Sequence, residues 1–173
     1  MRIYEGSPRQ DFEEVLRSIG AYLDRRGMRE ILLTEAPDGF IVQGLVVIGS
    51  GAWSEALGQV AKETLTFLDD DISRFMDEGV ARRALRPNVP MTEPGYYERA
   101  LRVIGRYMDE QKPRDVFFLE QDGSFIVRML MVDHAGSRHV LAEFPKDDVE
   151  RMIADGPAKR QRDAARHNAA KRA

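Results

Sequence analysis

Residues 12–24 read Phe-Glu-Glu-Val-Leu-Arg-Ser-Ile-Gly-Ala-Tyr-Leu-Asp, and residues 97–109 read Tyr-Glu-Arg-Ala-Leu-Arg-Val-Ile-Gly-Arg-Tyr-Met-Asp. The offset of 85 residues continues without a gap to the Phe-Ile-Val at 40–42 and 125–127. Of the 36 aligned pairs from 12/97 to 47/132, 14 are identical, against roughly one in fifteen to twenty for average residue usage. The sequence therefore predicts a tandem duplication, which constrains the architecture more firmly than local propensity does.

Each copy of the repeat opens with an amphipathic helix. Apolar residues recur at three- and four-residue spacing at positions 12, 15, 16, 19 and 23, and again at 97, 101, 104 and 108, which is one face of a helix. Gly27 and Pro113 follow these stripes. Because glycine favours the left-handed helix end and proline cannot continue a helix, both residues predict helix termination.

Three strands and a short helix follow in each copy. The strands are expected at about residues 30–34, 40–48 and 62–67, and at about 115–119, 125–132 and 138–144. Asp-Gly pairs at 38–39 and 122–123 separate the first two strands, and this dipeptide is a strong hairpin signal. Short helices ended by glycine are expected at 71–79 and 148–156. The first copy holds eight additional residues between 49 and 57.

The predicted fold is α+β, built from two fused α-β-β-β-α units with antiparallel sheets that form one globule about a pseudo-two-fold axis. The first unit is expected at residues 1–81 and the second at 95–156, joined by a linker at 82–94 that contains three prolines. Residues 157–173 form a basic tail. Three strands make a marginal sheet alone, so each unit is expected to bury its apolar face against the other.

Composition narrows the classes of function. The chain of 173 residues is 43% apolar and 32% charged, as is usual for globular proteins. The absence of cysteine excludes disulfides, thiolate metal sites and cysteine nucleophiles. No apolar run approaches the roughly 20 residues that span a bilayer, and no secretory signal is evident, so we expect a cytoplasmic protein without membrane contact. The tail carries six cations and one anion, which leaves a net charge of −8 for residues 1–156.

The run Val47-Ile48-Gly49-Ser50-Gly51-Ala52-Trp53 is the most suggestive local motif. It resembles the opening of NAD-dependent glycerol-3-phosphate dehydrogenases, a resemblance that implies a nucleotide site at the glycines. Ser54 stands where the third glycine of that motif would be, and the preceding strand is the second arm of a hairpin. The second copy has no glycine pair there. We therefore favour a loop insertion between strands and keep a nucleotide or small-molecule site at 49–53 as an alternative.

Two groups of residues are candidates for partner binding. Trp53, the only tryptophan, lies in the insertion and could anchor a partner. Gln43 and Arg128 occupy matching positions in otherwise apolar strands. They could direct polar groups into a shared groove, or they could mark the more solvated side of a sheet, which we favour.

The tail provides a further candidate surface. Its first cations are Lys159, Arg160, Arg162 and Arg166. They could neutralise phosphates in a salt-sensitive and sequence-independent way, but no aromatic residue is interleaved to stack on bases. Contact with nucleic acid or the ribosome is therefore an alternative function.

No motif in the sequence assigns a reaction. The acidic run 69–71 is interpreted as a helix cap, because acidic residues precede the matching helix at 147–148. We assign no catalytic, cofactor-binding or metal-binding residue. The sequence favours a non-enzyme, and the leading prediction is a protein-binding module of the adaptor or chaperone-like kind.

Overall fold

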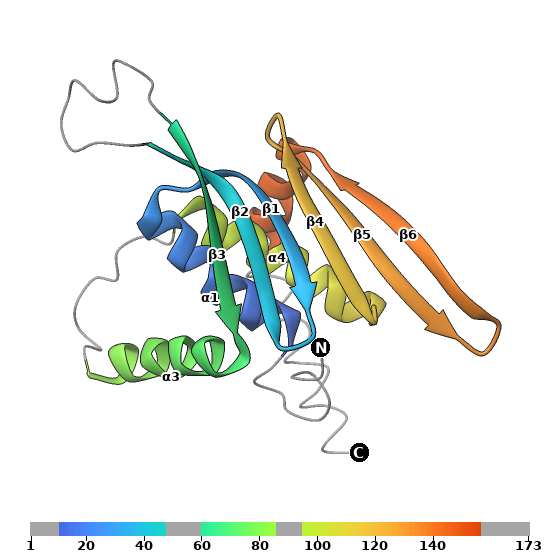
Figure 1. The fold of residues 1–173 in the computed structure, drawn as a ribbon, viewed down its shortest axis with the longest axis horizontal. Coiled ribbons are helices and arrows are strands. Elements are labelled where there is room, and N and C mark those ends of the chain that lie inside the picture. Colours follow the sequence, from blue (N-terminus) through green and yellow to red (C-terminus); the bar gives the residue numbers. More distant parts are fainter. Residues whose placement is uncertain (1–10, 48–59, 86–94, 157–173) are drawn as a thin grey trace.

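The structure, a computed structural model, describes residues 11–47, 60–85 and 95–156 (Figure 1). In chain order the described elements are α1 (Phe12–Arg26), β1 (Arg29–Ala36), β2 (Gly39–Val47), β3 (Val60–Leu68), α3 (Asp69–Leu85), α4 (Tyr96–Gln111), β4 (Asp115–Gln121), β5 (Ser124–Asp133) and β6 (Gly136–Phe144). A last helix occupies residues 146–156. The predicted order of helices and strands is therefore confirmed within the described residues, and the fold is α+β.

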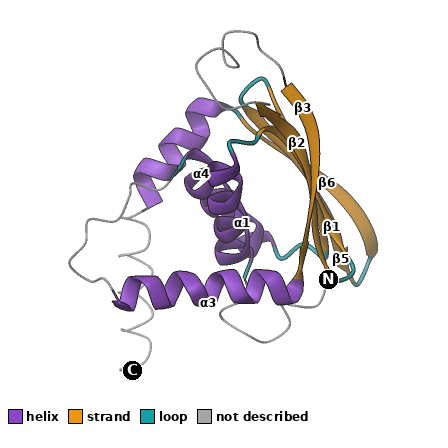
Figure 2. Ribbon diagram, turned by 60° about the vertical axis from the view of Figure 1, so that its left-hand side comes forward, coloured by secondary structure: helices purple, strands orange, loops and turns teal. Residues whose placement is uncertain are grey.

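The six described strands form one open antiparallel sheet in the order β3-β2-β1-β4-β5-β6. The described helices all lie on one face of this sheet (Figure 2). The sequence predicts an antiparallel sheet in each unit, and the structure shows that the two sets of three strands join edge to edge through β1 and β4. The core fills the space between the helices and the sheet and includes the predicted apolar positions Ile19, Phe40, Ile104 and Phe125, all fully buried.

The junction between β1 and β4 is short and is extended by two carboxylates. Backbone pairing is confined to 32–34 with 117–119 and centres on Leu33 opposite Phe118. On one side of this ladder the Val116 N–H donates to Glu35 Oε2 at 3.2 Å, and on the other the Ile31 N–H donates to Glu120 Oε2 at 3.2 Å. The two glutamates therefore accept backbone N–H groups where strand pairing has ended, which is what buried donors require.

Glu35 is the more buried of these two carboxyl groups, and its side chain points to the helical side of the sheet. Burial raises the pKa of Glu35 to about 7, and the nearby Asp115 carboxylate adds to this shift. The junction thus contains a titratable group whose charged form is disfavoured by its surroundings.

Helices α1 and α4 pack very closely, because a glycine lies at each contact. A Cβ on Gly20 would lie 2.4 Å from the Tyr97 carbonyl oxygen, and a Cβ on Gly105 would lie 2.5 Å from the Phe12 carbonyl oxygen. Real side chains essentially never approach backbone that closely. The two glycines, which the repeat aligns, are therefore required by the helix contact itself.

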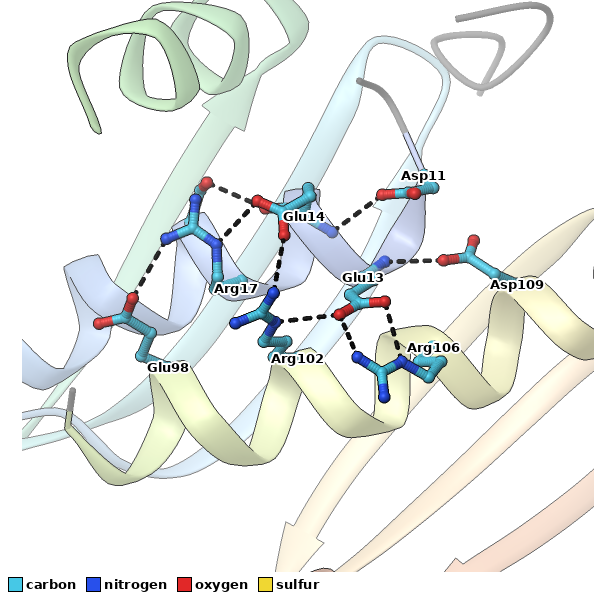
Figure 3. Close-up of polar contacts among 9 residues, drawn as sticks. Asp11, Glu13, Glu14, Arg17, Glu98, Arg102, Arg106 and Asp109 are labelled. Atoms are coloured by element: carbon cyan, nitrogen blue, oxygen red, sulfur yellow. Dashed lines mark hydrogen bonds and ion pairs between the residues drawn. The ribbon is translucent and has the colours of Figure 1, made fainter. Parts of the chain in front are cut away.

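Each of these helices also caps the start of the other, so the pair is antiparallel. The Asp24 carboxylate accepts the N–H groups of Tyr97 and Glu98 at 3.0 and 2.8 Å. The Asp109 carboxylate accepts those of Phe12 and Glu13 at 2.8 and 2.9 Å, and the bond to Glu13 is drawn in Figure 3. These four donors belong to the first turns of the helices, where no intrahelical acceptor exists. Burial nevertheless dominates at Asp109 and raises its pKa to about 6.

Ion pairs across α1 and α4 complete this contact (Figure 3). Arg17 bonds Glu98 at 3.1 Å, and Arg102 bonds Glu13 at 3.0 Å. Burial disfavours the charged form of Glu13, but hydrogen bonds from Arg106 and Arg102 outweigh it and hold the pKa of Glu13 below its ordinary value. The charged side chains between the helices therefore satisfy one another within the fold.

Three local details differ from expectation. The first hairpin turns at residues 37–38, with Gly39 already paired in β2, whereas the second turns at Asp122-Gly123 with positive φ at both residues. Proline at position 37 explains the difference, because its φ is fixed near −65° and excludes that turn type. Helix α3 runs to Leu85, four residues into the range assigned to the linker. Asp11 caps α1.

Candidate functional site

No described helix covers the face of the sheet opposite α1 and α4 (Figure 2). We call it the open face and define it by the strand residues whose side chains alternate with those of the core. Its members are Val60, Lys62, Thr64, Thr66 and Leu68 of β3, Ile41, Gln43, Leu45 and Val47 of β2, Leu32 and Thr34 of β1, Asp115, Phe117 and Leu119 of β4, Ile126, Arg128, Leu130 and Val132 of β5, and Ser137, His139, Leu141 and Glu143 of β6.

The centre of the open face is apolar. Across the β1–β4 junction Leu32 lies opposite Leu119, and Thr34 lies opposite Phe117. All four side chains are half-buried by their neighbours on the same face. Because the side-chain period of a strand is two, these residues cannot also reach the core on the helical side. The paired centre of the two middle strands, residues 32–34 and 117–119, thus presents no charged side chain on this face.

Apolar side chains continue outward from this centre. The exposed fractions are 70% for Leu141, 54% for Val60, 52% for Val132 and 40% for Val47. Contiguous apolar patches of this kind are uncommon on soluble monomers and usually mark interaction surfaces. The exposure of these residues therefore distinguishes the open face from the rest of the described surface.

Charged residues of the open face lie toward its edges. Lys62 and Glu143 are on the two edge strands, and Asp115 lies toward one end of β4. Arg128 is nearer the centre, with its guanidinium carbon 5.1 Å from the centroid of the Phe117 ring. A cation over an aromatic face is held there by the charge distribution of the ring. The positive and negative charges of these four residues cancel in sum.

Two of the predicted partner-binding residues lie on the open face. Gln43 on β2 is half-buried and Arg128 on β5 is exposed. Strands β1 and β4 separate them, so they do not meet in a common groove. The remaining candidates, Trp53, Lys159, Arg160, Arg162 and Arg166, lie outside the described residues, as does the glycine motif at 49–51.

The helical side carries polar side chains and a pocket, but these groups contact each other. A pocket of about 430 Å³ lies between the end of α1 and the start of α4, with Asp24, Tyr97 and Glu120 in its wall. The Tyr97 hydroxyl donates to Glu120 Oε2 at 2.6 Å, and burial together with this hydrogen bond raises the pKa of Tyr97. Asp24 caps α4. These side chains therefore have structural partners.

Sequence reasoning missed the apolar residues of the open face. Ile41, Leu45, Ile126 and Leu130 alternate with core residues in β2 and β5 and point the other way. The pattern was present in the sequence, because both strands are apolar at nearly every position. Continuous apolar runs of this length are typical of strands that are covered on both faces.

Comparison with known proteins adds no family: no protein-family model matches the chain, and neither a curated protein nor a solved structure matches it significantly. Among the described residues, no cluster of histidine and acidic side chains could hold a metal ion. None of the described helices combines the length and the apolar character needed to cross a bilayer. The open face therefore remains the candidate site on its own geometry.

Proposed function

We propose that this protein is a non-catalytic binding module of the adaptor or chaperone-like kind, and that it binds a protein through the open face of its sheet. The observation that carries the proposal is an apolar sheet face, centred on Leu32, Phe117 and Leu119, that no described helix covers. Burial of apolar surface drives most protein association. Binding of a partner over such a face is favourable because it removes apolar surface from water.

The distribution of residue types supports a protein as the partner. Specific protein interfaces have an apolar, charge-depleted centre and a polar rim. On the open face, the central positions 32 and 34 of β1 and 117 and 119 of β4 are uncharged. Asp115 lies toward one end of β4, and Lys62 and Glu143 occupy the edge strands. Arg128 adds a side chain of the type that most often contributes strongly to binding.

The ionisable residues on the helical side support a structural role for that side. Arg17, Arg102 and Arg106 pair with glutamates of the facing helix or of the same helix. These contacts fix the packing of α1 against α4. The proposal therefore assigns the two sides of the sheet different tasks, with stability on the helical side and binding on the open side.

We also propose that the chain arose by tandem duplication and that the two units are related by a pseudo-two-fold axis through the pair Leu33–Phe118. Three observations support this. Leu33 pairs with Phe118, the residue 85 positions later, across β1 and β4. Asp24 caps the helix of Asp109 and Asp109 caps that of Asp24. Glu35 and Glu120 accept N–H groups from Val116 and Ile31. The helix caps and the glutamate contacts of one half thus have counterparts in the other.

Photo-crosslinking tests the proposed binding surface. A photoreactive phenylalanine analogue replaces Leu141 on the open face, and in a control protein it replaces Gln111, which is exposed at the end of α4. We expect discrete covalent adducts of defined mass from position 141 and none from position 111. These adducts should disappear when Val132 on the same face is also changed to glutamate. Equal labelling from both positions, or no adduct from position 141, would refute the proposal.

A further inference from the structure

We infer that the open face is covered by a second copy of this chain, with the two sheets stacked face to face as a homodimer. The inference rests on the proposed function, because it takes the open face as a protein-binding surface and specifies its occupant. Two sheets stacked in this way lie about 10 Å apart, with their side chains interleaved as in a β-sandwich. The apolar centre of each copy then becomes part of one shared core.

The size of the face matches what a stable dimer needs. The sheet has six described strands, and β2, β3 and β6 are each 9 residues long. With strands about 4.8 Å apart and a rise of about 3.4 Å per residue, the face covers on the order of 700 Å². Two copies would therefore bury about 1,400 Å² together, which is within the range of about 1,200–2,000 Å² for specific interfaces.

The charges of the face are compatible with a copy of itself. Lys62 and Arg128 are positive, whereas Asp115 and Glu143 are negative. A face of one sign would repel its own copy, but these four charges sum to zero and lie mostly away from the centre. The four central residues Leu32, Thr34, Phe117 and Leu119 are uncharged, and Arg128, opposite Phe117, is the charged residue nearest to them. The open face is thus electrostatically neutral toward a second copy.

Symmetry favours contact at the centre. Homodimers are most often two-fold symmetric, and residues beside the axis then meet their own copies. An axis in the plane between the sheets that passes through the middle of the face lies beside Thr34 and Phe117. The same apolar cluster of each copy therefore contributes to the interface. A substitution that shortens one of its side chains or introduces a charge changes both sides of the interface at once.

Molar mass in solution is the first test. Sedimentation equilibrium of the full chain should give twice the 19.7 kDa chain mass at concentrations above about 10 µM, since interfaces of this size bind in the micromolar range or more tightly. Leu141→Glu combined with Val132→Glu should give the single-chain mass. Gln111→Glu adds charge of the same sign to the helical side and should leave the dimer intact. A wild-type protein of single-chain mass at this concentration would overturn the inference.

Cross-linking between engineered thiols is the second test, and the absence of cysteine makes it specific. Thr34→Cys places the sole thiol of the chain at the centre of the open face, and Gln111→Cys places it on the helical side. A short bismaleimide should link two copies of the Thr34→Cys protein and not two copies of the Gln111→Cys protein. A dimer that links only through position 111 would refute face-to-face stacking.

The two proposals fail in different ways. If the photoreactive group at position 141 forms adducts only with other proteins, and the chain sediments as a single copy, the open face is a binding surface but its occupant is not a second copy. If position 141 gives no adduct and the mass is that of one chain, the proposed function fails as well. Adducts at twice the chain mass, together with Thr34→Cys cross-links, support both.

Discussion

The two faces of this one sheet differ in how their side chains are satisfied. On the helical side, Phe118 and Phe125 are fully buried under α1 and α4. The carboxylates of Asp24 and Asp109 accept hydrogen bonds from backbone N–H groups. On the open side, the neighbouring side chains are equally apolar but have no described layer above them. The same strands thus contribute to a buried core on one side and leave apolar side chains uncovered by described residues on the other.

This difference has an energetic meaning. Burial of apolar surface is worth roughly 25 cal/mol per Å², so the helical side accounts for most of the stability of the single chain. The apolar surface of the open side is not buried by the described helices, so its burial by a partner would contribute free energy to binding instead. The comparison teaches that stability and binding can be measured separately by changing adjacent residues of one strand.

The largest expected effect comes from two adjacent phenylalanines of β4. Phe118 points to the helical side and is 1% exposed, whereas Phe117 points to the open side and is half-buried. Phe118→Ala should lower the free energy of unfolding by about 3–5 kcal/mol, the usual cost of a large-to-small change in a core. Phe117→Ala should cost less than half as much in urea titrations at concentrations too low for self-association. Equal costs would show that the open face is already part of a core.

The second expected effect tests the close contact of the helices. Gly20→Val places a side chain where a Cβ alone would lie 2.4 Å from the Tyr97 carbonyl oxygen, so α1 and α4 must separate. We expect a loss of about 3 kcal/mol or more in unfolding free energy, at the upper end of overpacking effects. Ala21→Val is the matched control, because it introduces the same side chain one residue later.

Tolerance of valine at position 20 would contradict the arrangement of the two helices. Valine is a better helix former than glycine and a weaker one than alanine, so helix propensity alone would make Gly20→Val the more stable of the two variants. A loss at Gly20→Val no larger than that at Ala21→Val would therefore show that the two helices do not approach each other so closely at Gly20. The described packing of α1 on α4 would then be wrong.

Much of this fold could be predicted from the sequence, because the decisive patterns are local. The apolar stripe that ends before Gly27 predicted α1, and the strand expected at 138–144 is present as β6. The joining of β1 to β4 could not be predicted, since residues near 33 and 118 pair across a large sequence separation. The two glutamates that extend this junction also have no local signature.

The candidate site was predicted only in part, for a related reason. Gln43 and Arg128 drew attention as polar residues in apolar strands, and both do lie on the open face. Their apolar neighbours, such as Ile41 and Ile126, could not be separated from core residues by hydropathy. Only the placement of the helices on one side of the sheet distinguishes the two sets (Figure 2).

The third expected effect is a change in pH dependence. Burial raises the pKa of Glu35 to about 7 from its ordinary 4.5, so the folded state retains a proton that the unfolded chain releases. Its contribution to stability is fully present below about pH 4.5 and is lost as the pH rises through about 7. Glu35→Gln removes this titration but retains an oxygen to accept the Val116 N–H.

We therefore expect the unfolding free energy of Glu35→Gln to fall less than that of the wild type between pH 4.5 and 7. Between pH 4.5 and neutral pH the two proteins should diverge by on the order of 3 kcal/mol, because the pKa is raised from 4.5 to about 7 and one pKa unit corresponds to about 1.4 kcal/mol. Urea titrations at several pH values measure it. Parallel pH profiles for the two proteins would show that Glu35 titrates normally and that its surroundings are solvated.

The smallest expected effect on folding belongs to the open face, and it sharpens the comparison most. Leu141 is 70% exposed on the edge strand β6, so Leu141→Glu removes little buried surface. The unfolding free energy of the single chain should change by no more than about 0.5 kcal/mol, as is usual for surface substitutions. Measured at low concentration by urea denaturation, a loss of several kcal/mol would mean that Leu141 is packed within its own chain. The same substitution should still weaken association through the open face, because removing a carboxylate from water is costly even where Arg128, opposite position 141, can pair with it. A variant that folds normally and no longer associates would therefore separate the two tasks of the sheet at a single residue.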